Sequence, residues 1–172
     1  MAGKGKYYES QFEEATIELL RESHWQYTFG DDIHRKYTDP LIEEDLRTFL
    51  AAQYKDKKLT ASEVDGIVAN LRNTGGQNDY YALQNTFLLY RDGYDFTYSD
   101  GRDNPFRLQY IDFEHPDHNI FRCVNQFVME QGRENRRPDI LLFVNGISVC
   151  IVELKNPTKQ NATIRDAYTQ IC

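Results

Sequence analysis

Apolar positions in the first half of the chain recur at helical spacing. Over residues 64–71 they fall at i, i+3, i+4 and i+7, the pattern of one buried helix face. Similar stripes over 12–20 and 42–53 predict two more helices. A fourth helix is predicted over 162–171, where apolar side chains again share one face. The first half of the chain is therefore expected to be mainly helical.

Local signals mark where these helices begin and end. Ser10 with Glu13, and Thr60 with Glu63, have the spacing of capping boxes at two helix starts. The Asp39–Pro40 pair is typical of the start of another helix. The Asn-Thr-Gly-Gly segment at 73–76 predicts the end of the third helix.

The second half of the chain changes to strand-like runs. Residues 106–113, 120–130, 139–144 and 147–155 are predicted strands, and 131–138 is predicted to be a charged turn. Asn145-Gly146 between the last two strands is a strong signal for a tight hairpin. These two strands are apolar on both faces, so we expect them at the centre of a covered sheet.

The order of elements predicts an α/β fold in which an antiparallel meander of about four strands is flanked by helices. We expect one domain over residues 1–172, with a mainly helical part over 1–90 and an α/β core over 91–172. The pattern at 162–171 runs to Cys172 with no stop signal, which we interpret as a cut through a longer protein.

Composition narrows the class of protein. No apolar run is long enough to cross a bilayer and the first residues lack a signal-peptide core, so we expect a cytoplasmic protein with no membrane partner. The cysteines match no zinc-site spacing, and we interpret Cys123 and Cys150 as buried free thiols. With a net charge of −7, either the basic residues cluster locally or partners supply most of any contact with nucleic acid.

Three charged groups interrupt the two apolar strands. Asp139 opens the first strand, and Glu153 and Lys155 close the second, where residues two apart share a face. A plain two-residue turn would pair 144 with 147 and hence 139 with 152, which puts Asp139 and Glu153 on opposite faces. A shared site therefore requires one extra residue in the loop or a β-bulge, and we predict such an offset.

Two carboxylates and a lysine on one face favour metal-dependent chemistry. Neighbouring carboxylates repel one another unless a cation lies between them, and Mg²⁺ prefers oxygen ligands. Such an ion could activate a water for attack on a phosphodiester, while Lys155 orients that water or offsets charge. The structural alternative is that Asp139 caps the turn and that Glu153 and Lys155 form an exposed pair at the strand end.

The segment 136–158 resembles the PD-(D/E)xK nuclease motif of the restriction (R) subunits of type I restriction–modification enzymes. The resemblance is carried by Pro-Asp at 138–139, Phe-Val-Asn-Gly at 143–146 and Glu-Leu-Lys-Asn-Pro at 153–157, with Val-Asn-Gln-Phe at 124–127 upstream. It is sharp over 106–172 and limited to the helix pattern before that. It implies a restriction-endonuclease-like core, a mostly antiparallel central sheet flanked by helices, with an N-terminal helical region.

The resemblance also implies roles for individual residues. Asp139, Glu153 and the backbone carbonyl of Leu154 would bind Mg²⁺, or Mn²⁺ in its place, and Lys155 would be the catalytic lysine. Gln170 falls at the glutamine of a Gln-x-x-x-Tyr motif whose tyrosine would lie beyond residue 172. Some relatives add a glutamate from the first helix, for which Glu13 is the candidate here, although helix capping explains Glu13 equally well.

By the same resemblance, the chain would be the endonuclease domain of a multi-subunit enzyme that cleaves double-stranded DNA. Methyltransferase and specificity subunits would be its partners, and ATP would be used only by a motor region absent from this chain, which has no phosphate-binding loop. Two alternatives remain open: a docking module without catalysis, and a repair or recombination nuclease with the same motif.

Further polar residues are candidates for contacts or for ordinary loops. Arg133, Arg136 and Arg137 precede Asp139 and could contact the DNA backbone, or form a solvated turn. His115 and His118 flank a Pro-Asp turn and are interpreted as loop residues.

Overall fold

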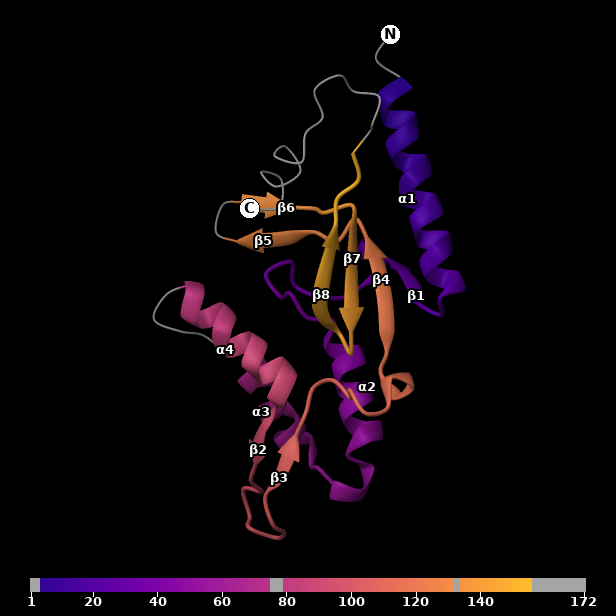
Figure 1. Ribbon diagram of the computed structural model, residues 1–172. Coiled ribbons are helices and arrows are strands. Elements are labelled where there is room, and N and C mark those ends of the chain that lie inside the picture. Colours follow the sequence, from indigo (N-terminus) through magenta and orange to yellow (C-terminus); the bar gives the residue numbers. More distant parts are fainter. Residues whose placement is uncertain (1–3, 75–78, 132–133, 156–172) are drawn as a thin grey trace. The chain divides into compact units, whose positions relative to one another are not determined.

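The computed structural model describes residues 4–74, 79–131 and 134–155 (Figure 1). The chain forms two compact units, one from residues 1–42 with 121–172 and the other from residues 43–120. The first unit is therefore discontinuous in sequence. The single domain over 1–172, with its boundary at residue 90 between a helical part and an α/β core, stays a prediction.

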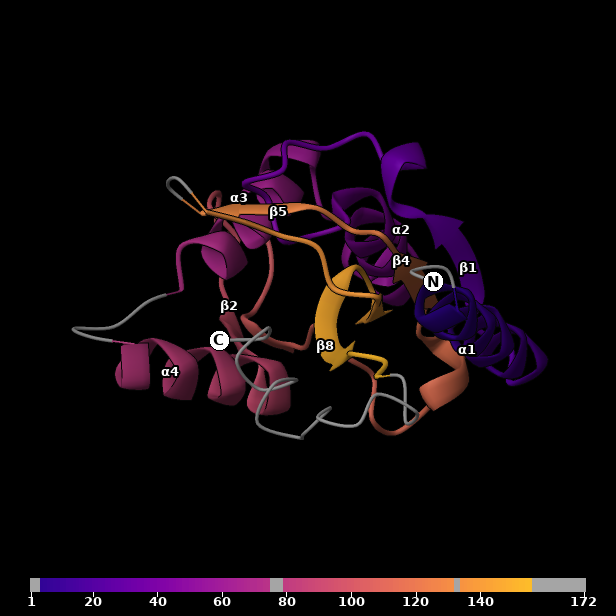
Figure 2. The same cartoon turned by 90° about the horizontal axis from the view of Figure 1, so that it is seen from above.

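A four-stranded sheet organises the first unit. Its strands are β1 (Gln26–Phe29), β4 (Phe121–Asn125), β7 (Ile140–Val144) and β8 (Ile147–Val152), in the order β1-β4-β7-β8. β1 runs parallel to β4, and the other neighbours are antiparallel. Helix α1 (Lys4–Glu22) lies beside β1 and β4 in both views (Figures 1 and 2). The expected α/β class with a mostly antiparallel sheet is confirmed, and it is compatible with a restriction-endonuclease-like fold.

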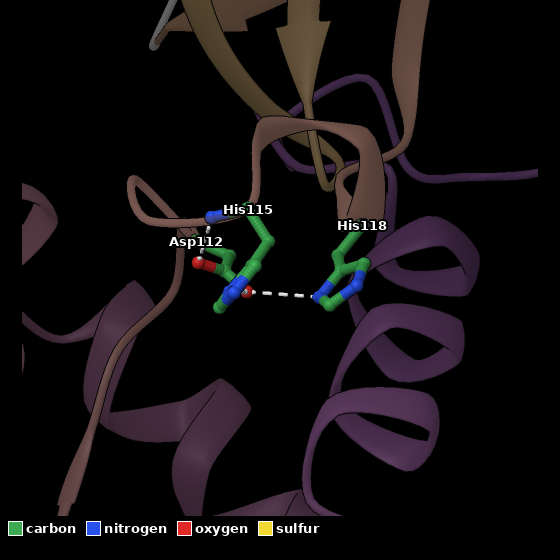
Figure 3. A group of neighbouring side chains, drawn as sticks. All are labelled: Asp112, His115 and His118. Carbon is green, nitrogen blue, oxygen red and sulfur yellow. Dashed lines mark hydrogen bonds and ion pairs between the residues drawn. The ribbon is translucent and has the colours of Figure 1, made fainter.

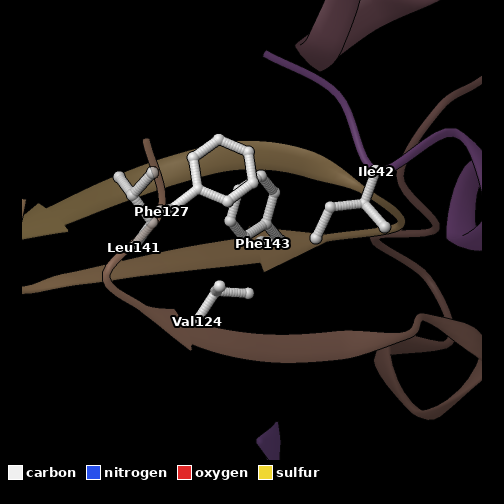
Figure 4. Packing of buried hydrophobic residues seen from close by; sticks show 5 residues of the cluster. All are labelled: Ile42, Val124, Phe127, Leu141 and Phe143. Carbon is white, nitrogen blue, oxygen red and sulfur yellow. The ribbon is translucent and has the colours of Figure 1, made fainter. Parts of the chain in front are cut away.

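Both faces of the sheet are covered at β7, as its apolar pattern predicts. The predicted central position of β8 is wrong, because β8 is the last strand in the described sheet order and its residues 149–151 are exposed. On one face Ile17 of α1 packs with Cys123 and Ile140. The other face carries a cluster whose side chains are almost wholly excluded from solvent (Figure 4). The members of this second cluster are Ile42, Val124, Phe127, Leu141 and Phe143. Residues of β7 therefore alternate between two apolar layers, which holds this strand at the centre of the unit.

The strands outside the hairpin differ from the prediction. The run 106–113 forms only the short strand β3 (Phe106–Leu108), which pairs with β2 (Tyr94–Phe96) in the second unit. Its place in the main sheet is taken by β1, a four-residue segment too short to show a pattern.

The predicted strand over 120–130 is interrupted at Gln126, which has a φ of 55°. Beyond this break the chain forms β5 (Met129–Gln131), which pairs with β6 (Glu134–Arg136) as a separate hairpin. The charged segment 131–138 is therefore not a simple turn, because part of it is strand.

The second unit contains α2 (Glu43–Gln53), α3 (Ala61–Arg72), α4 (Asp79–Asp92) and the β2–β3 pair. The capping box of Thr60 and Glu63 is confirmed at the start of α3. Buried side chains of α2 and α3 include Leu46, Phe49 and Ile67. Short 3₁₀ turns occur at Gly30–Asp32, Lys55–Lys57 and Pro116–His118.

Two predicted helix starts and one burial prediction are wrong. Helix α1 begins at Lys4, so Ser10 lies inside the helix and cannot cap its start. Helix α2 begins at Glu43, and Asp39 instead accepts a hydrogen bond from the Leu41 backbone in a turn before it. Cys123 is buried as expected, but Cys150 is exposed on β8.

Among the described helices, none has the length and apolar character required to cross a membrane.

Candidate active site

A β-bulge sets the register of the β7–β8 hairpin. Val144 lies opposite Ile147, and Phe143 lies opposite Ser148, as a plain two-residue turn requires. The register then shifts, so that Leu142 faces Cys150 and Ile140 faces Val152. Val149 is the extra residue of the bulge. The predicted one-residue offset is confirmed, and it places Glu153 rather than Val152 beside Asp139.

A hydrogen bond joins the two ends of this hairpin. The backbone N–H of Leu154 donates to Asp139 Oδ2 at 2.7 Å. Asp139 also lies close enough to the Glu153 carboxyl to shift its pKa. Two acidic residues separated by fourteen positions in sequence therefore lie side by side at one end of the hairpin.

The electrostatic environment of Glu153 reflects this proximity. Partial burial raises the pKa of the Glu153 carboxyl, and the negative charge of Asp139 raises it further. The positive charge of Lys155 acts in the opposite direction and lowers the Glu153 pKa. A cation bound beside Glu153 would offset the repulsion from Asp139, because it favours the ionised carboxylate.

A groove of about 460 Å³ opens beside the carboxylate pair. Asp139 and Glu153 line it together with Arg136, the last residue of β6, and Arg137, which follows that strand. Arg136 lies 3.5 Å from Glu134, and Arg137 is exposed. The groove therefore offers cationic side chains next to an acidic pair, an arrangement suited to a phosphate-bearing ligand.

A second polar group lies at the same end of the sheet. Asn125 pairs with Ile140, the residue after Asp139. Its side chain donates to Glu13 Oε1 at 2.7 Å and accepts from the Tyr27 hydroxyl at 3.0 Å. Burial and the nearby Glu13 raise the pKa of Tyr27. The sequence indicated Asn125 only as part of the 124–127 motif, and it gave no signal for Tyr27.

Some predicted site residues cannot be placed. Gln170 and Arg133 lie outside the described residues. Leu154 meets Asp139 through its backbone N–H. The proposed metal contact of the Leu154 carbonyl stays a prediction, as do the roles of Lys155 and Glu13.

The sequence of this chain matches a known protein family. The family described as type I restriction enzyme R protein N terminus matches residues 6–172. This chain belongs to that family. The predicted resemblance to the R subunits is confirmed over nearly the whole chain, including residues 6–105, in which the sequence showed only a helix pattern.

Relatives of this chain carry consistent names. The type I restriction enzyme HindI endonuclease subunit of Haemophilus influenzae is 28% identical over 172 residues, covering 94% of this chain and 16% of that protein. A putative type I restriction enzyme MjaIXP endonuclease subunit of Methanocaldococcus jannaschii is 29% identical, over 91% of this chain and 16% of that protein. This chain thus spans about a sixth of the length of these relatives.

Proposed function

We propose that this chain is the DNA-cleaving domain of a type I restriction enzyme R subunit and hydrolyses phosphodiester bonds with Mg²⁺, or Mn²⁺ in its place. The observation that carries the proposal is the position of Asp139 beside Glu153, set by the bulge, at the edge of a groove lined by arginines. Relatives of the chain are named endonuclease subunits, which agrees with this activity.

The donor set fits a hard divalent cation. Asp139 and Glu153 would hold the ion through carboxylate oxygens, with the Leu154 carbonyl as a third ligand. When bound, Mg²⁺ supplies charge stabilisation at the phosphoryl group and lowers the pKa of a coordinated water. The N–H of Leu154 fixes the orientation of Asp139, so one of its oxygens is already held in place.

The cationic side chains have separate roles in this proposal. Lys155 offsets the negative charge that develops on the phosphoryl oxygens, or positions the attacking water. Arg136 and Arg137 contact the backbone of double-stranded DNA along the groove, and Arg133 extends the same run. Gln170 assists at the site from the segment after the last catalytic strand.

The acidic character of the chain fits a domain that does not hold DNA by itself. With a net charge of −7, the chain would depend on other parts of the R subunit, and on methyltransferase and specificity subunits, for most of the DNA contact. ATP would serve only a motor region elsewhere in the R subunit. Cleavage by this domain would then show no sequence preference of its own.

Plasmid nicking tests the activity directly. The full chain should convert supercoiled plasmid to the nicked form with Mg²⁺ or Mn²⁺ and should fail to do so with EDTA. Lys155→Ala should lower the nicking rate about a hundredfold or more, the usual effect of removing a group that acts in proton transfer or charge stabilisation. A chain that does not nick, yet binds the methyltransferase–specificity core, would support the docking alternative and overturn the proposal.

Metal binding should appear as a stability change that depends on Glu153. A free ion concentration about ten times the Kd stabilises the folded state by about 1.4 kcal/mol, which raises Tm by roughly 3–6 °C for a chain of this size. Glu153→Gln should abolish this rise, whereas Lys155→Ala should keep it. Thermal unfolding with and without Mg²⁺ or Mn²⁺ measures both. An unchanged rise in the Glu153→Gln variant would remove Glu153 from the metal site.

The raised pKa of Glu153 should make both the stability of the metal-free fold and its stabilisation by metal depend on pH. The metal-free fold favours the protonated carboxyl, so the stability contributed by Glu153 is present at low pH and is lost as the pH rises through the raised pKa. At neutral pH, metal-free Glu153→Gln should therefore be more stable than the wild type. The stabilisation by metal should shrink as the pH falls from the raised pKa toward the ordinary value of 4.5, because protons compete with the ion.

A further inference from the structure

A cluster of one carboxylate and two imidazoles lies in the second unit. Its aspartate falls in the run predicted as a strand over 106–113, and its two histidines were interpreted as loop residues. Asp112 Oδ2 lies 3.1 Å from His118 Nδ1 and 3.6 Å from His115 Nδ1 (Figure 3). One nitrogen or oxygen of each of the three side chains falls within 4.8 Å of the others. The sequence signal was Asp-x-x-His-x-x-His, which does not match a common zinc motif.

The local backbone explains why the two imidazoles come together. Pro116 begins a 3₁₀ turn over Pro116–His118, and His115 stands immediately before it. A 3₁₀ turn has three residues per turn, so side chains three positions apart are eclipsed. The rings of His115 and His118 are accordingly stacked, with centroids 4.9 Å apart and an interplanar angle of 20°.

Hydrogen bonds from the backbone and from Gln53 hold the Asp112 carboxylate in place. Asp112 is only 5% exposed, and its Oδ1 accepts hydrogen bonds from the backbone N–H groups of Glu114 and His115. Gln53 Nε2 donates to Oδ2 at 2.8 Å. The His115 N–H makes the largest contribution to lowering the pKa of Asp112, to about 2, so this side chain is an ionised carboxylate at neutral pH.

The spacing of these atoms fits a transition-metal site. In a tetrahedral zinc site, ligand bonds of about 2.0–2.1 Å put neighbouring ligand atoms about 3.3 Å apart. The two Asp112–imidazole distances, 3.1 and 3.6 Å, bracket this value. Orientation of the carboxylate by Gln53 and backbone N–H groups is the outer-shell support that metal ligands usually have.

We propose that Asp112, His115 and His118 form a binding site for a divalent transition metal, with Zn²⁺ as the preferred ion. The side chains of His115 and His118 are 60% and 50% exposed, so a fourth position is open to water or to another ligand. Two imidazoles favour Zn²⁺ over Mg²⁺, which requires oxygen ligands. The site lies in a different compact unit from Asp139 and Glu153 and does not depend on the proposed nuclease function.

Calorimetric titration of the full chain with ZnCl₂, in excess Mg²⁺ to saturate oxygen-only sites, tests this proposal. We expect one zinc site in the wild type and a loss of affinity of about a hundredfold in His115→Gln/His118→Gln, since two of three ligands are removed. The exposed His34 offers a matched control, and His34→Gln should bind zinc as the wild type does. Glu153→Gln should also retain zinc binding, which separates this result from any failure of the nuclease proposal.

A single-residue variant and a second metal distinguish the loss of a zinc ligand from the loss of the fold. His115→Gln alone changes an exposed side chain and should keep the circular dichroism spectrum of the wild type while weakening zinc binding. Co²⁺ should give the visible absorption of a tetrahedral nitrogen and oxygen site in the wild type but not in the double variant. Zinc affinity that is unchanged in the double variant would overturn the proposal. Zinc affinity that is lost only in Cys150→Ser would also overturn it, because the exposed Cys150 thiol would then be the ligand.

Discussion

Asp139→Asn is expected to lower metal-dependent nicking by about a thousandfold. A divalent ion contributes several kcal/mol of charge stabilisation to the transition state, and each 1.36 kcal/mol corresponds to about a tenfold change in rate. Asparagine keeps the shape of the side chain and an oxygen that accepts the Leu154 N–H, so the fold should persist. It removes the negative charge on which ion binding depends. The rate of conversion of supercoiled plasmid at saturating Mg²⁺ measures the loss.

The matched control for this variant is Asp31→Asn. Asp31 is an exposed aspartate of the same compact unit, in the 3₁₀ turn after β1, and lies outside the groove. Its replacement should leave the nicking rate within about twofold of the wild type. If Asp139→Asn retained full activity, the cleavage would belong to another site or to a contaminating nuclease, and the assignment of Asp139 would be wrong.

Phe143→Ala should destabilise the first unit by about 3–5 kcal/mol, the usual range for truncating a buried phenylalanine. Phe143 is fully buried, and its ring centroid lies 5.1 Å from that of Phe127 in the cluster on one face of the sheet (Figure 4). The large-to-small change leaves a cavity between β7 and the segment after β4 that the surrounding strands can fill only in part.

Trp25 provides the measurement for this variant. It is the single tryptophan of the chain and packs near α1 and β4 of the first unit, with its ring 5.2 Å from that of Phe121. Its fluorescence in urea therefore reports the unfolding of this unit. Val149→Ala, on the same hairpin but 46% exposed, should change the free energy of unfolding by about 0.5 kcal/mol or less. Equal effects of the two substitutions would show that Phe143 is not part of a packed core.

The local elements of the hairpin were predictable because their signals are short-range. Asn145 and Gly146 both take positive φ, at 51° and 76°, as their sequence predicts for this turn. The apolar runs on either side predicted two strands, of which β7 is buried and β8 is largely exposed at the end of the described sheet. The positions of Asp139 and Glu153 predicted the one-residue offset. Thr60 and Glu63 likewise capped a helix because a capping box involves only neighbouring residues.

Elements that depend on distant partners were not predictable in the same way. β1 has no strong pattern and is a strand because its backbone pairs with β4, about a hundred positions away. The run 106–113 has strand-like composition, but only Phe106–Leu108 pairs, and it does so in the second unit. The signals at Ser10 and Asp39 were overridden because each helix begins where its backbone and packing allow.

By itself, the sequence determined the hairpin, the residues that flank its two ends and the family of the chain, since each depends on residues close together in a motif. Only the tertiary structure decided which residue of β8 forms the bulge and which side chain hydrogen-bonds to Glu13. It also decided that a buried aspartate lies next to two exposed histidines. These juxtapositions arise from the packing of segments far apart in the chain and from backbone turns that side-chain patterns do not encode.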